Sequence, residues 1–266
     1  MLRSARNILG HRSSAKDGDV GRCVDFLVDA NEWLVRYLVV ETGSWLPGRR
    51  VLISPFALSK ADWTSRRLVF EGTRAQVASA PLFDDEAPIS RGQELDLFRH
   101  YGWSTSELGP VPEPIPLSEH GGPPPMGPGL RSVKEILSYG LEAEDGNVGH
   151  VDDFIVDDDT WLLRHLVVSG RNWLSGHRVL IPTERILGVD WEDRQVEVTL
   201  PSAAIEKGPQ FDPSAPVYDV NVATGTTPVS PGGRPPMLPA WLTDFVACET
   251  WGTRGLRAAL ARIIHG

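Results

Sequence analysis

DGDVGRCVDFLVDANEWLVRYLVV at residues 17–40 returns as DGNVGHVDDFIVDDDTWLLRHLVV at residues 145–168. The match continues without a gap between residues 2–88 and residues 130–216, which are offset by 128 positions and identical at 36 of 87. A duplication of this length indicates two copies of one small domain in this chain of 266 residues. A chemical group present in only one copy cannot be what the duplicated unit exists to provide.

The pattern of apolar residues in each copy predicts several short strands. Asp17-Gly18 is typical of a tight hairpin turn, and Val20–Val28 alternates apolar residues after it. Trp33–Val40 is β-branched and aromatic, which favours a second long strand, and Val51–Ile53 a third. With further short strands around Trp63, five or six strands fit a small closed barrel, because closure removes exposed edges.

Short helices and proline-rich linkers flank the predicted strands. Ser4 and Ser132 are placed as N-caps of helical turns, and residues 109–129 contain eight prolines. The predicted fold class is mainly β, with two small β-barrels in tandem. The predicted organisation is a first repeat (2–88), a helix with a Pro-rich linker (89–129), a second repeat (130–216), a second linker (217–239) and a C-terminal amphipathic helical tail (240–266).

Charge is distributed unevenly along an acidic chain of net charge −9. Residues 2–88 carry a net charge of +1 and residues 130–216 a net charge of −8. An acidic chain lacks the clustered cations that phosphate contacts require, so direct nucleic-acid binding is not expected. The two cysteines, Cys23 and Cys248, indicate no disulfide framework. With no signal peptide or transmembrane segment in the sequence, we expect a cytoplasmic protein.

The sequence D-G-x-V-G-x-x-x-D-F-x-V-D, then W-L-x-R-x-L-V-V, then R-V-L-I, resembles the PRC-barrel domain in both copies. This family includes the cytoplasmic domain of the photosynthetic reaction-centre H subunit and the C-terminal domain of the ribosome maturation factor RimM. The resemblance implies a six-stranded β-barrel used for binding and assembly, with no catalytic residues to carry over. The chain resembles the tandem PRC-barrel proteins of bacteria more than it resembles either of these two.

Candidate catalytic and metal-binding groups are not shared by the two copies. His150, His165 and His177 stand where the first copy has arginine or tyrosine, and no Cys/His cluster has zinc spacing. Neither a P-loop nor a G-x-S-x-G sequence is present. We therefore expect no enzyme activity, no cofactor and no metal site, and we interpret Asp157–Asp159 as a solvated acidic turn.

A charged pair recurs inside the predicted strands. Asp25 and Arg36 reappear as Asp153 and Arg164, in strands that are otherwise apolar. Because a charge in such a strand is costly unless it is paired and hydrogen-bonded, we predict structural pairs Asp25–Arg36 and Asp153–Arg164.

Three tryptophans recur, and one pair lies in a predicted loop. Trp45 and Trp173 belong to W-L-x-G-x-R, beside Arg50 and Arg178. These four residues are candidates for contacting a partner, because an exposed aromatic beside an arginine is suited to gripping a protein. The alternative is that each loop tryptophan folds back and plugs the end of its barrel.

The tail combines an apolar stripe with three arginines, Arg254, Arg257 and Arg262, and contains no acidic residue between Thr253 and His265. Such a helix could lie weakly on anionic lipid or dock onto protein, and its charge favours docking.

The function predicted from these features is non-catalytic binding or assembly of protein partners. The alternatives are a regulatory module that senses a ligand or ion between the barrels, and a peripheral component of a ribosome-maturation or photosynthetic electron-transfer assembly. The partner protein stays unidentified, and the sequence leaves open whether the barrels pack within one chain or across a homodimer.

Overall fold

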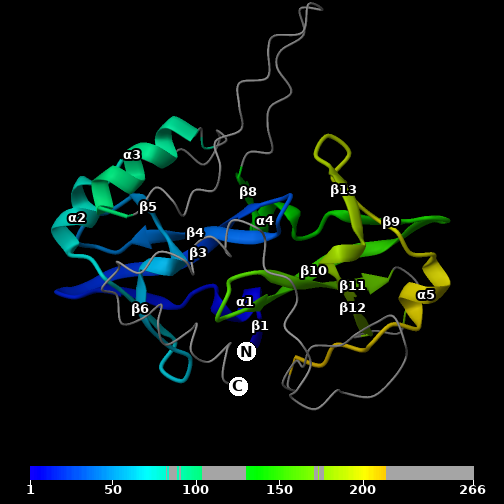
Figure 1. The fold of residues 1–266 in the computed structure, drawn as a ribbon. Helices are drawn as coiled ribbons and strands as arrows, with labels where there is room; N and C mark the ends of the chain where they lie inside the picture. Colours follow the sequence, from blue (N-terminus) through cyan, green and yellow to red (C-terminus); the bar gives the residue numbers. More distant parts are fainter. Residues whose placement is uncertain are drawn as a thin grey trace, which may run out of the picture.

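The computed structural model describes residues 1–81, 83, 89, 91–103, 130–170, 173 and 177–213 (Figure 1). Most of the first predicted linker, all of the second, and the C-terminal tail lie outside the described residues. The described chain is mainly β, with two seven-stranded sheets and a few short helices, which confirms the predicted fold class.

The first repeat contains seven strands and two short helices, and an eleven-residue helix follows it. The elements are β1 (Leu2–Ser4), α1 (Ala5–Ile8), β2 (Arg12–Ala15), β3 (Gly18–Asp29), β4 (Leu34–Thr42), β5 (Arg50–Ile53), the 3-10 turn η1 (Pro55–Ala57), β6 (Leu58–Asp62), β7 (Arg67–Phe70), α2 (Arg74–Ser79) and α3 (Arg91–Tyr101).

The second repeat contains the same elements in the same order up to its last short helix. They are β8 (Leu130–Ser132), α4 (Val133–Ile136), β9 (Gly140–Ala143), β10 (Gly146–Asp157), β11 (Leu163–Gly170), β12 (Arg178–Pro182), the 3-10 turn η3 (Thr183–Arg185), β13 (Ile186–Asp190), β14 (Gln195–Val198) and α5 (Ser202–Glu206).

Six strands of each repeat form one continuous path of hydrogen-bonded neighbours. The order is β5-β4-β3-β2-β7-β6 in the first sheet and β12-β11-β10-β9-β14-β13 in the second. Neighbours are antiparallel except for β2 with β7 and β9 with β14, which are parallel. The two strands that a 3-10 turn connects lie at opposite ends of their path: β5 and β6 around η1, and β12 and β13 around η3. Each sheet therefore curls into a barrel-like unit.

The seventh strand of each sheet comes from the other repeat. β1 pairs antiparallel with β10 through Leu2↔Asp157, and β8 pairs antiparallel with β3 through Asp29↔Leu130. The helices α1 and α4 follow their strands and contact β10 and β3 respectively. Each repeat therefore completes the sheet of its neighbour, and Figure 1 shows α1 and β1 lying against the second unit.

One hydrophobic core runs through both units. Leu34 and Leu162 form an isolated bridge where the units meet, and the backbone amides of Val35 and Leu163 donate across it to the carbonyls of Trp161 and Trp33. The Trp33 ring stacks on Phe154 at 5.8 Å between centroids. Its counterpart Trp161 lies 6.4 Å from Phe26. Burial of these aromatic rings across the junction favours a single rigid body over two independently moving domains.

The long strands β3 and β10 bend at a glycine that permits close approach of the next strand. A Cβ atom on Gly21 would lie 1.9 Å from the carbonyl oxygen of Glu41, and one on Gly149 would lie 2.0 Å from that of Ser169. Both neighbours are backbone atoms, so neither position accommodates a side chain. Glycine at this site allows each 12-residue strand to pair with different neighbours along its length.

The outer face of the first sheet is covered by α3. Leu97 and Phe98 of this helix pack with Tyr37, Val39 and Leu52 in a second apolar cluster. The phenol of Tyr37 donates to the buried Glu94 carboxylate at 3.0 Å. On the second sheet the equivalent face packs Phe211 against a group of three strand residues, Ile155, Val167 and Leu180.

Candidate functional site

The recurring aspartates join the two repeats. Asp25 accepts hydrogen bonds from the hydroxyl of Ser132 at 2.5 Å and from the backbone amide of Lys134 at 3.1 Å. Asp153 accepts from the hydroxyl of Ser4 and from the backbone amide of Arg6. Each carboxylate therefore caps the first turn of a helix that belongs to the other repeat.

Among the interactions between described residues, neither of the predicted pairs Asp25–Arg36 and Asp153–Arg164 occurs. Arg36 lies 3.7 Å from the carboxylate of Glu94 in α3. The residue of β4 that faces Asp25 is Val39, because the register shifts between Cys23 and Asp25. The need for a partner was inferred correctly, but the partner is a helix N-terminus more than a hundred residues away.

Both carboxylates are protected from water. Burial raises the pKa of Asp25, and the hydrogen bonds from Ser132, Lys134 and Phe26 oppose that rise. The pKa of Asp153 is raised by burial in the same way, against opposing hydrogen bonds from the other repeat. The same hydrogen bonds form in both repeats. The presence of a shielded carboxylate in each is therefore explained by its role in joining the two units.

Trp45 folds back onto its own sheet. Its indole N–H donates to the carbonyl of Val20 at 2.6 Å, and the guanidinium of Arg74 lies over its ring at 4.4 Å. The ring is half-buried and packs against the core. Neighbouring Arg50 is exposed and lies 3.9 Å from the carboxylate of Glu41. This geometry matches the second interpretation of the loop, in which the tryptophan closes the barrel end.

Trp173 is also half-buried against the core, with its ring edge-on to His177 at 5.0 Å. Arg178 forms an ion pair with Asp152 at 2.5 Å, and Arg6 from the first repeat reaches the same carboxylate at 3.4 Å. Arg178 thus shares a carboxylate with a residue of the first repeat, whereas Glu41, which Arg50 contacts, belongs to the same repeat as Arg50. Partner contact by these four residues stays a prediction.

The acidic turn Asp157–Asp159 brings three carboxylates within 4.8 Å of one another. Cations of the protein itself already face them, since Arg3 lies 2.5 Å from Asp158 and the Met1 ammonium contacts the same residues. Two cations of the protein thus face the three carboxylates, and the turn is part of the anchorage of β1.

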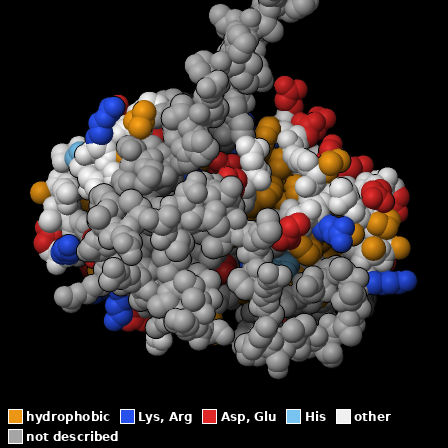
Figure 2. All heavy atoms as spheres, viewed as in Figure 1, with side chains coloured by type: hydrophobic (Ala, Val, Ile, Leu, Met, Phe, Trp, Pro, Cys, Tyr) orange, Lys and Arg blue, Asp and Glu red, His pale blue; other side chains and the backbone are white. Residues whose placement is uncertain are grey.

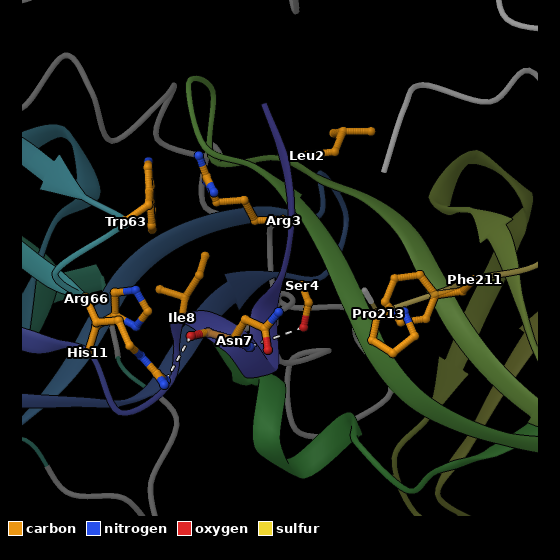
Figure 3. Close-up of a pocket in the computed structure, with 10 residues that line it drawn as sticks. All are labelled: Leu2, Arg3, Ser4, Asn7, Ile8, His11, Trp63, Arg66, Phe211 and Pro213. Carbon is orange, nitrogen blue, oxygen red and sulfur yellow. Dashed lines mark hydrogen bonds between the residues drawn. The ribbon is translucent and has the colours of Figure 1, made fainter. Parts of the chain in front are cut away.

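A cavity of about 370 Å³ opens where the first repeat, the exchanged segment and the end of the second repeat meet (Figure 3). Arg3 stacks over Trp63 at 4.3 Å, and His11 lies edge-on to the same ring at 5.9 Å. Arg66 donates to the backbone carbonyl of Asn7 at 3.4 Å. The lining is completed by Leu2, Ser4, Ile8, Phe211 and Pro213.

His11 is the unusual member of this lining. It is 4% exposed, and its Nδ1 has no hydrogen-bond partner. Burial lowers the pKa of His11, and the charges of Arg66 and Arg3 lower it further, against a smaller opposing effect of the Ile8 carbonyl. A buried polar atom left without a partner costs about 1–3 kcal/mol, so its retention calls for an explanation.

The second repeat has different residues at the positions equivalent to His11 and its neighbour Asn7. Arg3, Trp63 and Arg66 recur as Arg131, Trp191 and Arg194, and Arg131 again lies over Trp191 at 4.4 Å. His11 and Asn7 are replaced by Tyr139 and Glu135, and the Tyr139 hydroxyl donates to Glu135 at 2.8 Å. Sequence comparison of the copies contained this signal, since two differences fall within an otherwise repeated set.

A row of arginines crosses the outside of the first sheet. The strand register places Arg12 directly beside Arg22 on one side and Arg67 on the other. Arg12 and Arg22 are exposed and form no ion pair with any residue that the structure describes, while Arg67 lies 3.2 Å from Asp19. The equivalent row in the second repeat is Gly140, His150 and Gln195.

Opposite charge gathers on the second sheet. Figure 2 shows acidic side chains around the hairpin between β13 and β14, where Asp190, Glu192 and Asp193 are exposed. Like charges placed directly opposite on neighbouring strands destabilise a sheet. Folding alone therefore does not explain why three arginines lie side by side on neighbouring strands of the first sheet.

The strand order, the paired glycines and the exchanged segments now give a fold to compare with known families. Residues 140–205 form a PRC-barrel domain. This PRC-barrel domain extends from β9 into α5, and the first repeat reproduces its path of six strands in the same order. No curated protein matches the chain. None of the helices within the described ranges has the length and apolar character needed to span a bilayer.

Proposed function

We propose that this protein is a non-catalytic adaptor in which two PRC-type barrels, the domain at 140–205 and its repeat in the first half, hold protein partners. The observation that carries the proposal is the arginine row Arg22-Arg12-Arg67. Arg12 and Arg22 are exposed, the three like charges lie on neighbouring strands, and the second repeat lacks them. A surface that disfavours folding yet lies outside the core fits a binding role.

The partner surface that fits this row is acidic and protein in nature. A groove of about 400 Å³ beside it is lined by three cations and one carboxylate together with Ser65 and Val69: Arg12, Lys60, Arg67 and Asp62. The chain as a whole has net charge −9, which disfavours approach to the extended phosphate backbone of nucleic acid. A local cationic row within an acidic molecule instead favours a compact acidic protein surface.

The exchanged segments support an adaptor rather than two independent modules. Because β1 and β8 lock the units together, the cationic face of one and the acidic face of the other keep a fixed relative orientation. Two different partners would then be held in a defined geometry without a flexible connection between their binding sites. The recurring ionisable groups Asp25 and Asp153 are engaged in that junction, which leaves them unsuited to acid–base chemistry.

The test is a crosslinked pull-down from native lysate with wild type and two charge-matched variants. The first combines Arg12→Gln, Arg22→Gln and Arg67→Gln; the control combines three exposed cations outside the row, Lys134→Gln, Arg185→Gln and Lys207→Gln. We expect an acidic protein that is captured by wild type and by the control but lost with the first variant. Equal capture by all three would remove the row from the proposal.

The adaptor assignment also predicts that the purified protein shows no turnover with a broad substrate panel. Sustained turnover that survives the glutamine substitutions would overturn it. Ribosome-maturation and photosynthetic electron-transfer complexes are the two assemblies whose acidic proteins are the first to examine among those captured.

A further inference from the structure

The cavity between the repeats has an electrostatic imbalance. Arg3 is neutralised by Asp158 at 2.5 Å, but Arg66 contacts only the neutral carbonyl of Asn7 among the groups that line the cavity. His11 adds a ring nitrogen that lacks a hydrogen-bond partner. The cavity therefore has one net positive charge on Arg66, directed toward Asn7, and one unused polar atom on His11, whose ring lies edge-on to Trp63 (Figure 3).

The remaining walls combine Ser4 and Asn7 with four apolar side chains. Leu2 and Ile8 come from the exchanged segment, and Phe211 and Pro213 come from the end of the second repeat. A volume of about 370 Å³ is within the range of small-molecule sites, which typically combine apolar walls with a few polar groups that fix orientation. One positive charge matches one negative charge on the ligand, and the walls match an apolar body.

We propose that this cavity binds a small organic monocarboxylate whose carboxylate lies between Arg66 and His11 and whose apolar body lies against Ile8 (Figure 3). This inference goes beyond the adaptor function. Arg12 and Arg67 of the row follow His11 and Arg66 in the chain, but the cavity and the groove beside the row share no lining residue, so each proposal can fail without the other.

At the corresponding position the second repeat carries a carboxylate of the protein itself, Glu135. Tyr139 donates to the Glu135 carboxylate at 2.8 Å, and the charges of Arg131 and Arg194 act on the same hydroxyl. In the first repeat Asn7 replaces the glutamate and His11 replaces the tyrosine. The first cavity thus lacks the carboxylate that its counterpart carries, and a ligand carboxylate would restore the same balance.

Isothermal titration calorimetry of the full chain with benzoate tests this proposal, with benzamide, acetate and inorganic phosphate as comparison probes. We expect benzoate to bind with one site, acetate and phosphate to bind at least tenfold more weakly, and benzamide to give no heat. Absence of benzoate binding would overturn the proposal. Phosphate binding as tight as benzoate would also overturn it, because the apolar walls would then contribute nothing.

Variants locate the site. The double change Asn7→Glu with His11→Tyr copies the second repeat and should abolish benzoate binding while leaving the melting temperature unchanged or higher. Arg66→Gln should weaken binding at least tenfold, and Arg194→Gln is the matched control that should leave it unchanged. Equal weakening by Arg66→Gln and Arg194→Gln would place the binding elsewhere and contradict the assignment. Retained binding in the double variant would contradict it as well.

Discussion

The two repeats share an internal frame and differ on their surfaces. Glycines at the strand bend, aspartates at the junction and tryptophans against the partner core are the same in both. The outer face of one carries α3 and a row of arginines, whereas the other carries acidic hairpins. Residues that hold the two units together have been kept in pairs, and residues that face outward have diverged. Differences between the copies are therefore a guide to binding surfaces, and identities are a guide to assembly.

The strongest test of the shared frame is substitution of the bend glycines. Gly21→Ala and Gly149→Ala each force a Cβ atom against a backbone carbonyl, so each should lower the free energy of unfolding by about 3 kcal/mol or more. Chemical denaturation of both variants measures this. Gly188→Ala, where a Cβ would meet open space, is the control and should have a much smaller effect. A large effect in one repeat alone would show that the frames are not equivalent.

The junction aspartates should tolerate an amide but not a methyl group. Asp25→Ala leaves the amides of Lys134 and Phe26 without an acceptor, which should cost about 3 kcal/mol. Asp25→Asn retains an acceptor oxygen and should stay within about 1 kcal/mol of wild type. Denaturation midpoints distinguish the two, and the Asp153 series should give the same ranking. A severe Asp25→Asn variant would mean that charge, rather than hydrogen bonding, holds the junction.

Tyr37→Phe tests the attachment of α3, a helix with no counterpart in the described part of the second repeat. Loss of the hydrogen bond to Glu94 should weaken attachment of α3 by about 1 kcal/mol and speed amide hydrogen exchange in that helix. Tyr139→Phe removes the corresponding type of bond to Glu135 in the second repeat and should leave exchange in α3 unchanged. Faster α3 exchange in both variants would indicate global loosening instead.

The pH dependence of stability gives the smallest and most diagnostic effect. The pKa of Asp25 and of Asp153 is raised in the folded state above the ordinary value of 3.8. The folded state therefore binds protons more readily, so this contribution to stability is fully present below the ordinary pKa and is lost as pH rises through the folded one. The Asp25→Asn/Asp153→Asn variant lacks it. Stability of wild type relative to this variant should rise as pH falls from about 6 to about 4; an unchanged difference would contradict the burial of these groups.

Local features of the fold were predictable from the sequence because their causes are local. Asp-Gly turns, β-branched runs and serine caps identify β3, β4 and the short helices within a few residues, and Ser4 and Ser132 do accept from the amides of Asn7 and Glu135. The exchange of β1 and β8 was not predictable, since each segment is compatible with its own repeat or the other. What decides between them is contact between residues more than a hundred positions apart.

The same limit explains the incorrect charge pairs and the missed cavity. Asp25 and Arg36 are both unusual in apolar strands, but a bulge in β3 aligns Asp25 with Val39 and leaves its carboxylate for α4. The cavity depends on Arg3, His11 and Phe211, which come together only because the exchanged segment lies between the units. The loop tryptophans were left between two interpretations, and the hydrogen bond from Trp45 to Val20 decides its orientation.

The exchange of segments also sets an order of events during synthesis. The first 81 residues leave the ribosome with β1 lacking its partner strand and with Asp25 facing no helix, since β8 and α4 are encoded about 50 residues further on. The first barrel therefore keeps an unpaired strand edge until residue 137 has emerged. β1 stays unpaired for longer, until β10 has emerged. A pause in translation within the intervening chain would prolong that exposure, so nascent chains of this protein should depend on chaperones that cover unpaired strands.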